Sequence, residues 1–207
     1  MKYVKILGLA AVAAMALMAF GAGTASATKL CNNNLSTTAC SSHLAVGTVI
    51  EATMKAGTSS ILETTGGSTL DTCTGMDLTG KTENTNETGK PVGVTVTALT
   101  WTGCTFPTAT TALGTLDISH IAGTDNGTLV ATGTEVTINT GFFGACTYGA
   151  PATGLHLGTV TGGNPASITI NALVPLTKNE SGLCPAEARW TGSFTVTKPT
   201  PLYASHN

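Results

Sequence analysis

The stretch PVGVTVTALTWTGC, residues 91–104, decides the fold class of the chain. Its apolar side chains recur at every second position: Val92, Val94, Val96 and Ala98. Strict alternation of this length is typical of a β-strand with one buried face. Pro91 suits the start of a strand, because proline cannot donate to the ladder. We therefore expect a long central strand that carries Trp101 and a disulfide-bonded Cys104 at its far end.

Short alternating segments recur along the rest of the chain, for example ASITINALVPL (166–176) and ARWTGSFTVT (188–197). The triplet Asp125-Asn126-Gly127 predicts a tight hairpin, because Asn-Gly tolerates the positive φ that such turns need. Thr74-Gly75 is expected to separate two strands, and residues 105–113 to form an irregular loop. About ten or eleven short strands with regular turns favour an all-β fold, an antiparallel β-sandwich or a jelly-roll-like fold.

The N-terminus has the three-part layout of a secretory signal peptide. Lys2 and Lys5 precede an apolar run over residues 6–20, and Ala25-Ser26-Ala27 offers a small-residue cleavage site. The alternative is a membrane anchor, but the apolar run is short for a membrane span. We therefore predict a signal peptide over residues 1–27 and a single secreted, extracellular β domain over residues 28–207. We expect no membrane span after cleavage.

Charge is scarce in the mature chain. Without Lys2 and Lys5, seven of the nine basic residues remain against eleven acidic ones, a net charge of −4. Nucleic acid is therefore a poor partner, because its binding needs a basic surface. Threonine is abundant instead, and it favours extended backbone and gives a strand surface polarity without charge. We expect a monomer that meets an unknown extracellular partner or cell-surface component.

All six cysteines lie in the mature chain: Cys31, Cys40, Cys73, Cys104, Cys146 and Cys184. An even number of cysteines in an exported chain indicates disulfides, and six cysteines allow 15 pairings. Sequential strands tend to be neighbours, which favours Cys31–Cys40, Cys73–Cys104 and Cys146–Cys184. The sequence contains no C-x-x-C and no histidine at ligand spacing from a cysteine pair, so we predict no metal site.

The sequence holds no local catalytic arrangement, and we expect no enzymatic activity and no cofactor. The nucleophile elbow Gly-x-Ser-x-Gly is absent. His120 lies on the apolar face of its predicted strand and is expected in the core or at an edge, whereas His156 is expected to face solvent. Asp71, Asp77 and Asp125 offer oxygens for calcium, but too few of them lie in one short segment.

Aromatic side chains are the remaining candidates for recognition. Trp190 and Phe194 share a strand face, and packing in the core is the expected role of both. The alternative is an exposed platform for a sugar or an apolar ligand. Phe142 and Phe143 lie in a glycine-flanked stretch where partial exposure is expected, because adjacent strand residues face opposite ways. Phe142, Phe143 and Trp190 are therefore the predicted ligand-binding residues.

Several segments resemble a family of small exported bacterial proteins of unknown function. They are LTWTGC (99–104), DISHIAGTDNGTLVATGTEVTI (117–138), CTYG (146–149), HLGTVTGG (156–163) and CPAEARWTGSFTVTKPTPLY (184–203). The resemblance runs from Cys73 to Tyr203 and leaves out Cys31 and Cys40. It implies an extracellular setting and a β fold, and it implies neither an activity nor catalytic residues.

Two function hypotheses follow from these observations. The first is a secreted, non-catalytic structural or interaction domain, which a threonine-covered surface with buried aromatic side chains would favour. The second is a small-ligand or carbohydrate-binding module with an aromatic-lined cleft. An apolar pocket that contains Phe142, Phe143 or Trp190 together with convergent polar groups would favour the second hypothesis. A cluster of His120 or His156 with two carboxylates in a cleft would instead indicate a hydrolase.

Overall fold

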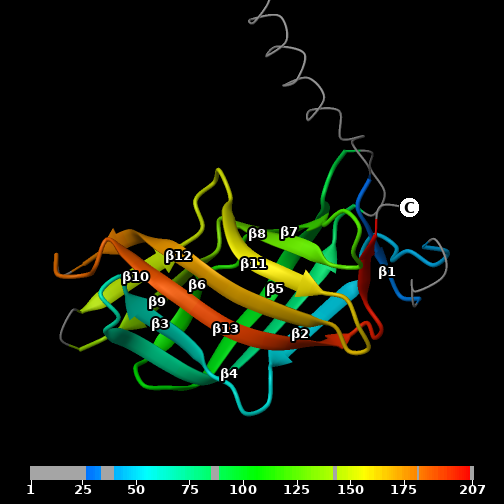
Figure 1. Ribbon diagram of the computed structural model, residues 1–207. Coiled ribbons are helices and arrows are strands. Elements are labelled where there is room, and N and C mark those ends of the chain that lie inside the picture. Colours follow the sequence, from blue (N-terminus) through cyan, green and yellow to red (C-terminus); the bar gives the residue numbers. More distant parts are fainter. Residues whose placement is uncertain (1–26, 34–39, 85–88, 142–143, 181, 206–207) are drawn as a thin grey trace, which may run out of the picture.

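The computed structural model describes residues 27–33, 40–84, 89–141, 144–180 and 182–205, and over these ranges the chain is all-β (Figure 1). The strands are β1 (Lys29–Cys31), β2 (Val49–Met54), β3 (Ser60–Thr64), β4 (Thr69–Thr82), β5 (Val92–Cys104), β6 (Thr108–Ala112), β7 (Thr115–His120), β8 (Gly127–Thr132), β9 (Glu135–Asn139), β10 (Ala145–Gly149), β11 (Leu155–Thr161), β12 (Ser167–Asn179), β13 (Glu187–Lys198) and β14 (Tyr203–Ser205). Every pairing is antiparallel, which confirms the predicted fold class.

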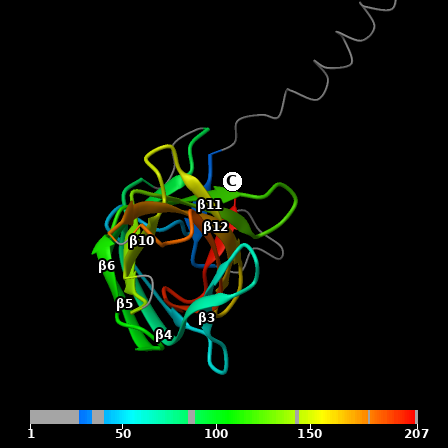
Figure 2. The same cartoon turned by 90° about the vertical axis from the view of Figure 1, so that its left-hand side faces the viewer.

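The large sheet closes on itself through the pairing of β12 with β13. Its strand order is β2-β13-β3-β4-β5-β7-β8-β11-β12-β10-β9-β6, and additional pairings join β2 to β4 and β12 to β13. Figure 2 shows the strands arranged around a common axis. Two layers therefore face each other across one core, as in a sandwich, but hydrogen-bonded strands connect them. We call this arrangement the ring.

Four long strands, β4, β5, β12 and β13, run through both halves of the ring. Between β4 and β13, one half contains β2 and the other half contains β3. Between β5 and β12, one half contains β7, β8 and β11, joined by ladders throughout. The other half contains β10, β9 and β6. The described residues form no ladder between β5 and β6, and we call this place the seam.

A β-bulge in the central strand moves its buried face by one residue. Val92, Val94 and Val96 are buried as predicted, but Ala98 is exposed and Leu99 is buried in its place. Opposite this point, Thr79 pairs with Ala98 and Gly80 pairs with Val96, so that no residue of β4 lies opposite Thr97 in the register. An extra residue in one strand reverses which side chains face inward beyond it. The bulge thereby turns Trp101 toward the core.

Three local predictions were wrong. The strand β4 runs without a break through Thr74-Gly75; Gly75 pairs with Thr102 of β5, whose side chain leaves no room for a Cβ at this position. Residues 108–112 form β6 rather than an irregular loop. The hairpin between β7 and β8 exists, but the positive φ of its loop belongs to Gly123 rather than to Asn126 or Gly127.

The interior of the ring is a continuous apolar core. Val92, Val94, Val196 and Phe194 are at most 2% exposed. A smaller cluster around Tyr148 lies beside β10 and β12. Burial of a large apolar side chain contributes about 1.5–3 kcal/mol, so the stability of the ring rests on these inward faces.

All three predicted disulfides are present: Cys31–Cys40, Cys73–Cys104 and Cys146–Cys184. Cys73 and Cys104 lie directly opposite each other on β4 and β5, so this bond crosses one strand pair. The bond from Cys146 ties β10 to the chain just before β13. Such bonds are typical of proteins that fold in an oxidising compartment.

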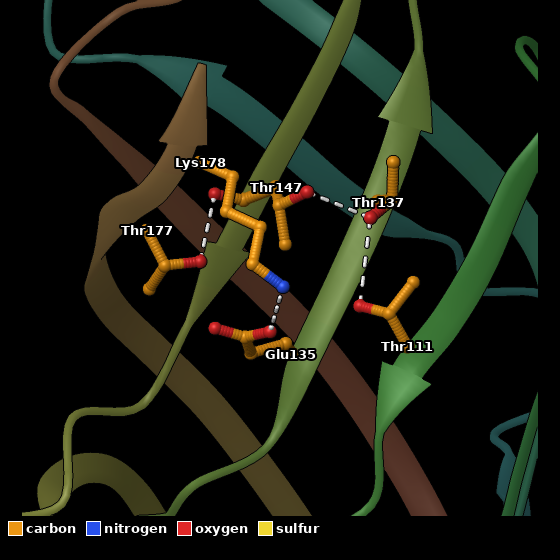
Figure 3. A network of polar contacts seen from close by, with 6 residues as sticks. All are labelled: Thr111, Glu135, Thr137, Thr147, Thr177 and Lys178. Atoms are coloured by element: carbon orange, nitrogen blue, oxygen red, sulfur yellow. Dashed lines mark hydrogen bonds and ion pairs between the residues drawn. The ribbon is translucent and has the colours of Figure 1, made fainter. Parts of the chain in front are cut away.

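Hydroxyl groups cover much of the outer face. Five of them lie in register across β7, β8, β11, β12 and β13, and we call them the hydroxyl row: Ser119, Thr128, Thr159, Thr169 and Ser193. Figure 3 shows a second group on the outside of β6, β9, β10 and β12. There the hydroxyls of Thr137 and Thr147 lie 2.7 Å apart, and Lys178 Nζ lies 3.2 Å from Glu135 Oε2.

The two ends of the described chain lie side by side, because β1 pairs with β14. The predicted signal peptide lies outside the described residues, except for Ala27. Thr28, the predicted first mature residue, is 6% exposed, and its Oγ1 accepts a hydrogen bond of 3.1 Å from the His120 backbone N–H. The described residues contain no helix long and apolar enough to cross a membrane.

Candidate ligand cavity

A cavity of about 100 Å³ lies inside the ring. Its lining is mostly apolar and comes from all of the strands β2 to β13; it includes Met76, Leu99, Val136, Ile170 and Phe194. Native cores rarely contain voids larger than a water molecule. A void of this size in an otherwise close-packed interior is therefore the leading place to look for a ligand.

One carboxyl group, that of Asp71 of β4, lines the cavity while the residue is only 3% exposed. Its Oδ1 accepts backbone N–H bonds from Thr72 at 2.8 Å and from Phe106 at 3.1 Å. Its Oδ2 accepts a hydrogen bond of 2.6 Å from Thr108 Oγ1. All three partners can donate to the carboxyl oxygens, an arrangement that suits an acceptor-only carboxylate.

Two tryptophans line the same cavity, Trp101 of β5 and Trp190 of β13. Their ring centroids are 5.9 Å apart and their planes meet at 59°. The Trp190 Nε1–H donates to Ser60 Oγ at 2.7 Å, and the Trp101 Nε1–H donates to Thr110 Oγ1 at 3.1 Å. Because both indole N–H groups already have partners, the tryptophans offer the cavity their apolar rings.

The short strand β6 holds two of these groups in place. Thr108 binds the Asp71 carboxylate, and Thr110, two residues further on, binds the Trp101 indole. The Thr110 hydroxyl also donates to the Leu99 carbonyl at 2.8 Å. Side-chain bonds therefore join β5 and β6 across the seam, where the two strands have no ladder.

A shallow surface hollow of about 470 Å³ lies outside the seam. Its lining residues are Trp101, Cys104, Thr105, Phe106, Pro107 and Thr108. Trp101 and Thr108 line both the hollow and the cavity. These two side chains therefore stand between the hollow and the cavity, at the seam, where side-chain bonds join β5 and β6.

The structure separates the predicted ligand-binding residues. Trp190 lines the cavity, and its ring packs edge-on against Phe194 with centroids 6.4 Å apart, as expected for a core residue. Phe142 and Phe143 lie outside the described residues. The core position expected for Trp190 is what the structure shows, and the alternative of an exposed platform does not hold there.

The histidines do not join this site. His156 is exposed, as predicted. His120 is half-buried, and its Nε2 lies 2.6 Å from the Thr124 carbonyl oxygen. Neither residue is among those that line the cavity. The described residues therefore do not place either histidine with two carboxylates in a cleft.

The aspartates considered for calcium point in different directions. Asp71 faces the cavity, whereas Asp77 on the same strand is exposed. Asp71 instead lies close to Cys73 and Cys104, with ligand atoms within 4.8 Å of one another. The two sulfurs are bonded to each other, and a disulfide has no thiolate to bind a metal. The Asp71 carboxylate is therefore the one metal ligand that this group offers.

Burial shifts the pKa of one cavity residue. The Tyr148 side chain lines the cavity, and its hydroxyl donates to the Pro185 carbonyl at 3.1 Å. Burial raises the pKa of Tyr148 to about 12, because a phenolate would lose its hydration. On the opposite half of the ring, burial and the nearby Glu83 carboxylate raise the pKa of Asp117.

The sequence reasoning missed Asp71 as a cavity residue, although a signal was present. Aspartate is depleted in strand interiors, yet Asp71 lies between Leu70 and Cys73 in an alternating segment. An acidic residue at an inward-facing position of a strand indicates either a carboxylate with a structural role or a ligand-binding site. Thr108 had no such signal, because residues 105–113 were predicted to form a loop.

Comparison of the chain with family models, with curated proteins and with solved structures found no match. The functional conclusion therefore rests on the geometry of the cavity.

Proposed function

We propose that residues 28–207 form a secreted, non-catalytic domain that binds a small, largely apolar molecule inside the ring. The observation that carries this proposal is the cavity of about 100 Å³ lined by Trp101 and Trp190. Ligand sites are concave and mostly apolar, with a few well-placed polar groups, and Asp71 and Ser60 are such groups here. The three disulfides support an oxidising, extracellular setting.

The lining favours an apolar ligand over a carbohydrate. A sugar needs a hydrogen-bond partner for each buried hydroxyl, because an unpaired polar group costs about 1–3 kcal/mol. Asp71, Ser60, Thr108 and Thr134 are the cavity's main polar side chains, and all four already bond to one another or to neighbouring groups. A cavity of about 150 Å³ accepts benzene, with its six non-hydrogen atoms, so the cavity of about 100 Å³ holds a ligand of roughly four or five.

The test is a titration of the folded, disulfide-bonded protein with isobutanol, followed by tryptophan emission and thermal unfolding. A ligand that binds only the native state raises the melting temperature. At a ligand concentration one hundred times Kd, it increases the free energy of unfolding by about 2.7 kcal/mol. Ala131, which is 2% exposed, lines the cavity, and Ala131→Leu fills it. The control Ala98→Leu adds the same volume on the outer face.

We expect isobutanol to stabilise the wild type and Ala98→Leu and to leave Ala131→Leu unchanged. An unchanged melting temperature and unchanged emission in the wild type would overturn the proposal. So would equal stabilisation of Ala131→Leu, because the ligand would then bind elsewhere.

A second candidate function is an interaction domain that contacts a cell-surface component through its outer face. The observation that favours it is the hydroxyl row, five in-register side chains without a charge among them. Its test is co-sedimentation with insoluble peptidoglycan, with Thr159→Lys/Thr169→Lys as the variant. Sedimentation that the double variant abolishes would support this function, and no sedimentation of the wild type would reject it.

Secretion has a direct test of its own. N-terminal sequencing of the protein from the culture medium should read Thr28 first, because cleavage is predicted after Ala27. An intact Met1 in the purified protein would contradict the predicted export.

A further inference from the structure

We propose that the cavity is selective for a small organic cation, an apolar alkyl body that carries one ammonium group, and that Asp71 is the residue that selects it. This inference rests on the proposed ligand-binding function and names the chemical class of the ligand. It starts from the one feature of the cavity that a purely apolar ligand would not use, the buried carboxylate.

The charge of Asp71 has no cationic partner in the described part of the chain. The ion pairs found there join Lys178 to Glu135 and Lys198 to Glu51, both at the surface. The partners of Asp71 are two backbone N–H groups and one hydroxyl, all neutral. An ionised group buried without a counter-charge is costly unless it is hydrogen-bonded, and a cation placed beside it gains strongly.

The carboxylate also has room for one more donor. A carboxylate has about four lone-pair sites on its two oxygens. Oδ1 accepts two hydrogen bonds, from Thr72 and Phe106, whereas Oδ2 accepts one, from Thr108. Oδ2 also lies 3.6 Å from the sulfur of Cys73, which is in a disulfide and has no proton to donate. The remaining site on Oδ2 suits one N–H of an ammonium group.

The rings of Trp101 and Trp190 complete an ammonium-binding environment. Both side chains line the same cavity as Asp71. Their N–H groups are bound to Thr110 and Ser60, which leaves the ring faces for contact. The face of an indole attracts a cation, by roughly 0.5–2 kcal/mol. An anion, by contrast, would meet the carboxylate and gain from neither ring.

The position of Asp71 relative to the seam gives the cation a route. Phe106 and Thr108 line the surface hollow, and both donate a hydrogen bond to the Asp71 carboxylate. A ligand that enters past Trp101 therefore meets the carboxylate close to the mouth of the cavity. Its alkyl part then extends among the apolar side chains.

The experiment compares three probes of similar shape at neutral pH: isobutylammonium, isobutanol and isobutyrate. Calorimetry and tryptophan emission measure the affinity of the folded, disulfide-bonded protein for each. We expect isobutylammonium to bind on the order of tenfold more tightly than isobutanol, because a hydrogen bond to a charged group is stronger than a neutral one. We expect isobutyrate to bind most weakly.

Two variants and one control assign the selectivity to Asp71. Asp71→Asn keeps the shape and should remove the preference for the ammonium probe while isobutanol still binds. Thr108→Val leaves the carboxylate in place and frees a second site on Oδ2, so the preference should persist or increase. Asp77→Asn removes an exposed carboxylate from the same strand and should change nothing.

The outcomes separate this inference from the proposed function. If no probe binds the wild type, the cavity function itself is overturned. If isobutanol binds as tightly as isobutylammonium, the cavity binds ligands but the cation selectivity is wrong. If Asp71→Asn fails to fold, the three probes on the wild type and on Thr108→Val still decide.

Discussion

Replacement of Asp71 should separate the loss of a hydrogen-bond acceptor from the loss of a charge. Asp71→Ala removes the acceptor of two backbone N–H groups, those of Thr72 and Phe106. The Thr108 hydroxyl keeps an alternative, because the Phe106 carbonyl lies 3.1 Å from its Oγ1. Two partly buried donors are then left without a partner, at about 1–3 kcal/mol each. We therefore expect Asp71→Ala to lower the free energy of unfolding by about 2–6 kcal/mol.

Asp71→Asn is the matched control for this prediction. The amide oxygen still accepts both N–H groups, the Thr108 hydroxyl turns to the Phe106 carbonyl, and the uncompensated charge disappears. We expect a change smaller than about 2 kcal/mol. The difference between the two variants matters because a native domain is stable by only about 5–15 kcal/mol.

The assay is urea unfolding with the disulfides intact, followed by tryptophan emission, with the free energy extrapolated to water. Equal destabilisation by the two variants would show that the seam requires the negative charge of Asp71 rather than its hydrogen-bond acceptor oxygens. A loss below about 1 kcal/mol for Asp71→Ala would show that water reaches the two donors, and that the carboxylate is not sealed inside.

Three further outcomes follow from the structure. Tyr148 should titrate near pH 12 when its ionisation is followed by absorbance at 295 nm. Because its pKa is raised in the folded protein, stability should fall as the pH rises from 10 to 12, and Tyr148→Phe should remove that fall. Because the pKa of Asp117 is raised in the folded protein, ionisation of this carboxyl group should lower stability as the pH rises through that pKa. Asp117→Asn should make this fall smaller, as measured by urea midpoints at a series of acidic pH values. Replacement of Cys146 and Cys184 together by alanine opens a 38-residue separation, and should cost about 4 kcal/mol in the same unfolding assay; a cost near zero would mean that the unfolded chain is not constrained by this bond.

The features that the sequence predicts well are those set by neighbouring residues. Alternation with a period of two identified β5 and β13, and the disulfide between Cys73 and Cys104 follows from the pairing of sequential strands. Each of these depends on side chains that are close in the chain or on adjacent strands. The class of the fold was therefore predictable from pattern alone.

The features that the sequence does not predict depend on register and on distant contacts. The bulge at Thr97 shifts the buried face of β5 from Ala98 to Leu99, and nothing in the local pattern marks it. The strand β6 is mostly threonine and alanine, so its extended form comes from pairing with β9 and from bonds to Asp71 and Trp101. The cavity exists only once β12 and β13 have closed the ring, and no local signal indicates that closure.

The hydroxyl row has a consequence for the conditions under which the protein works. Side-chain hydroxyls neither gain nor lose a proton between acid and mild alkali, and they attract no atmosphere of counter-ions. Charged side chains make up only 10% of the chain. Dilution into fresh water or transfer into brine therefore alters little of what Thr128, Thr159 and Thr169 present to their surroundings. A protein built in this way keeps the same outer face across environments that would recharge or screen an acidic or a basic one.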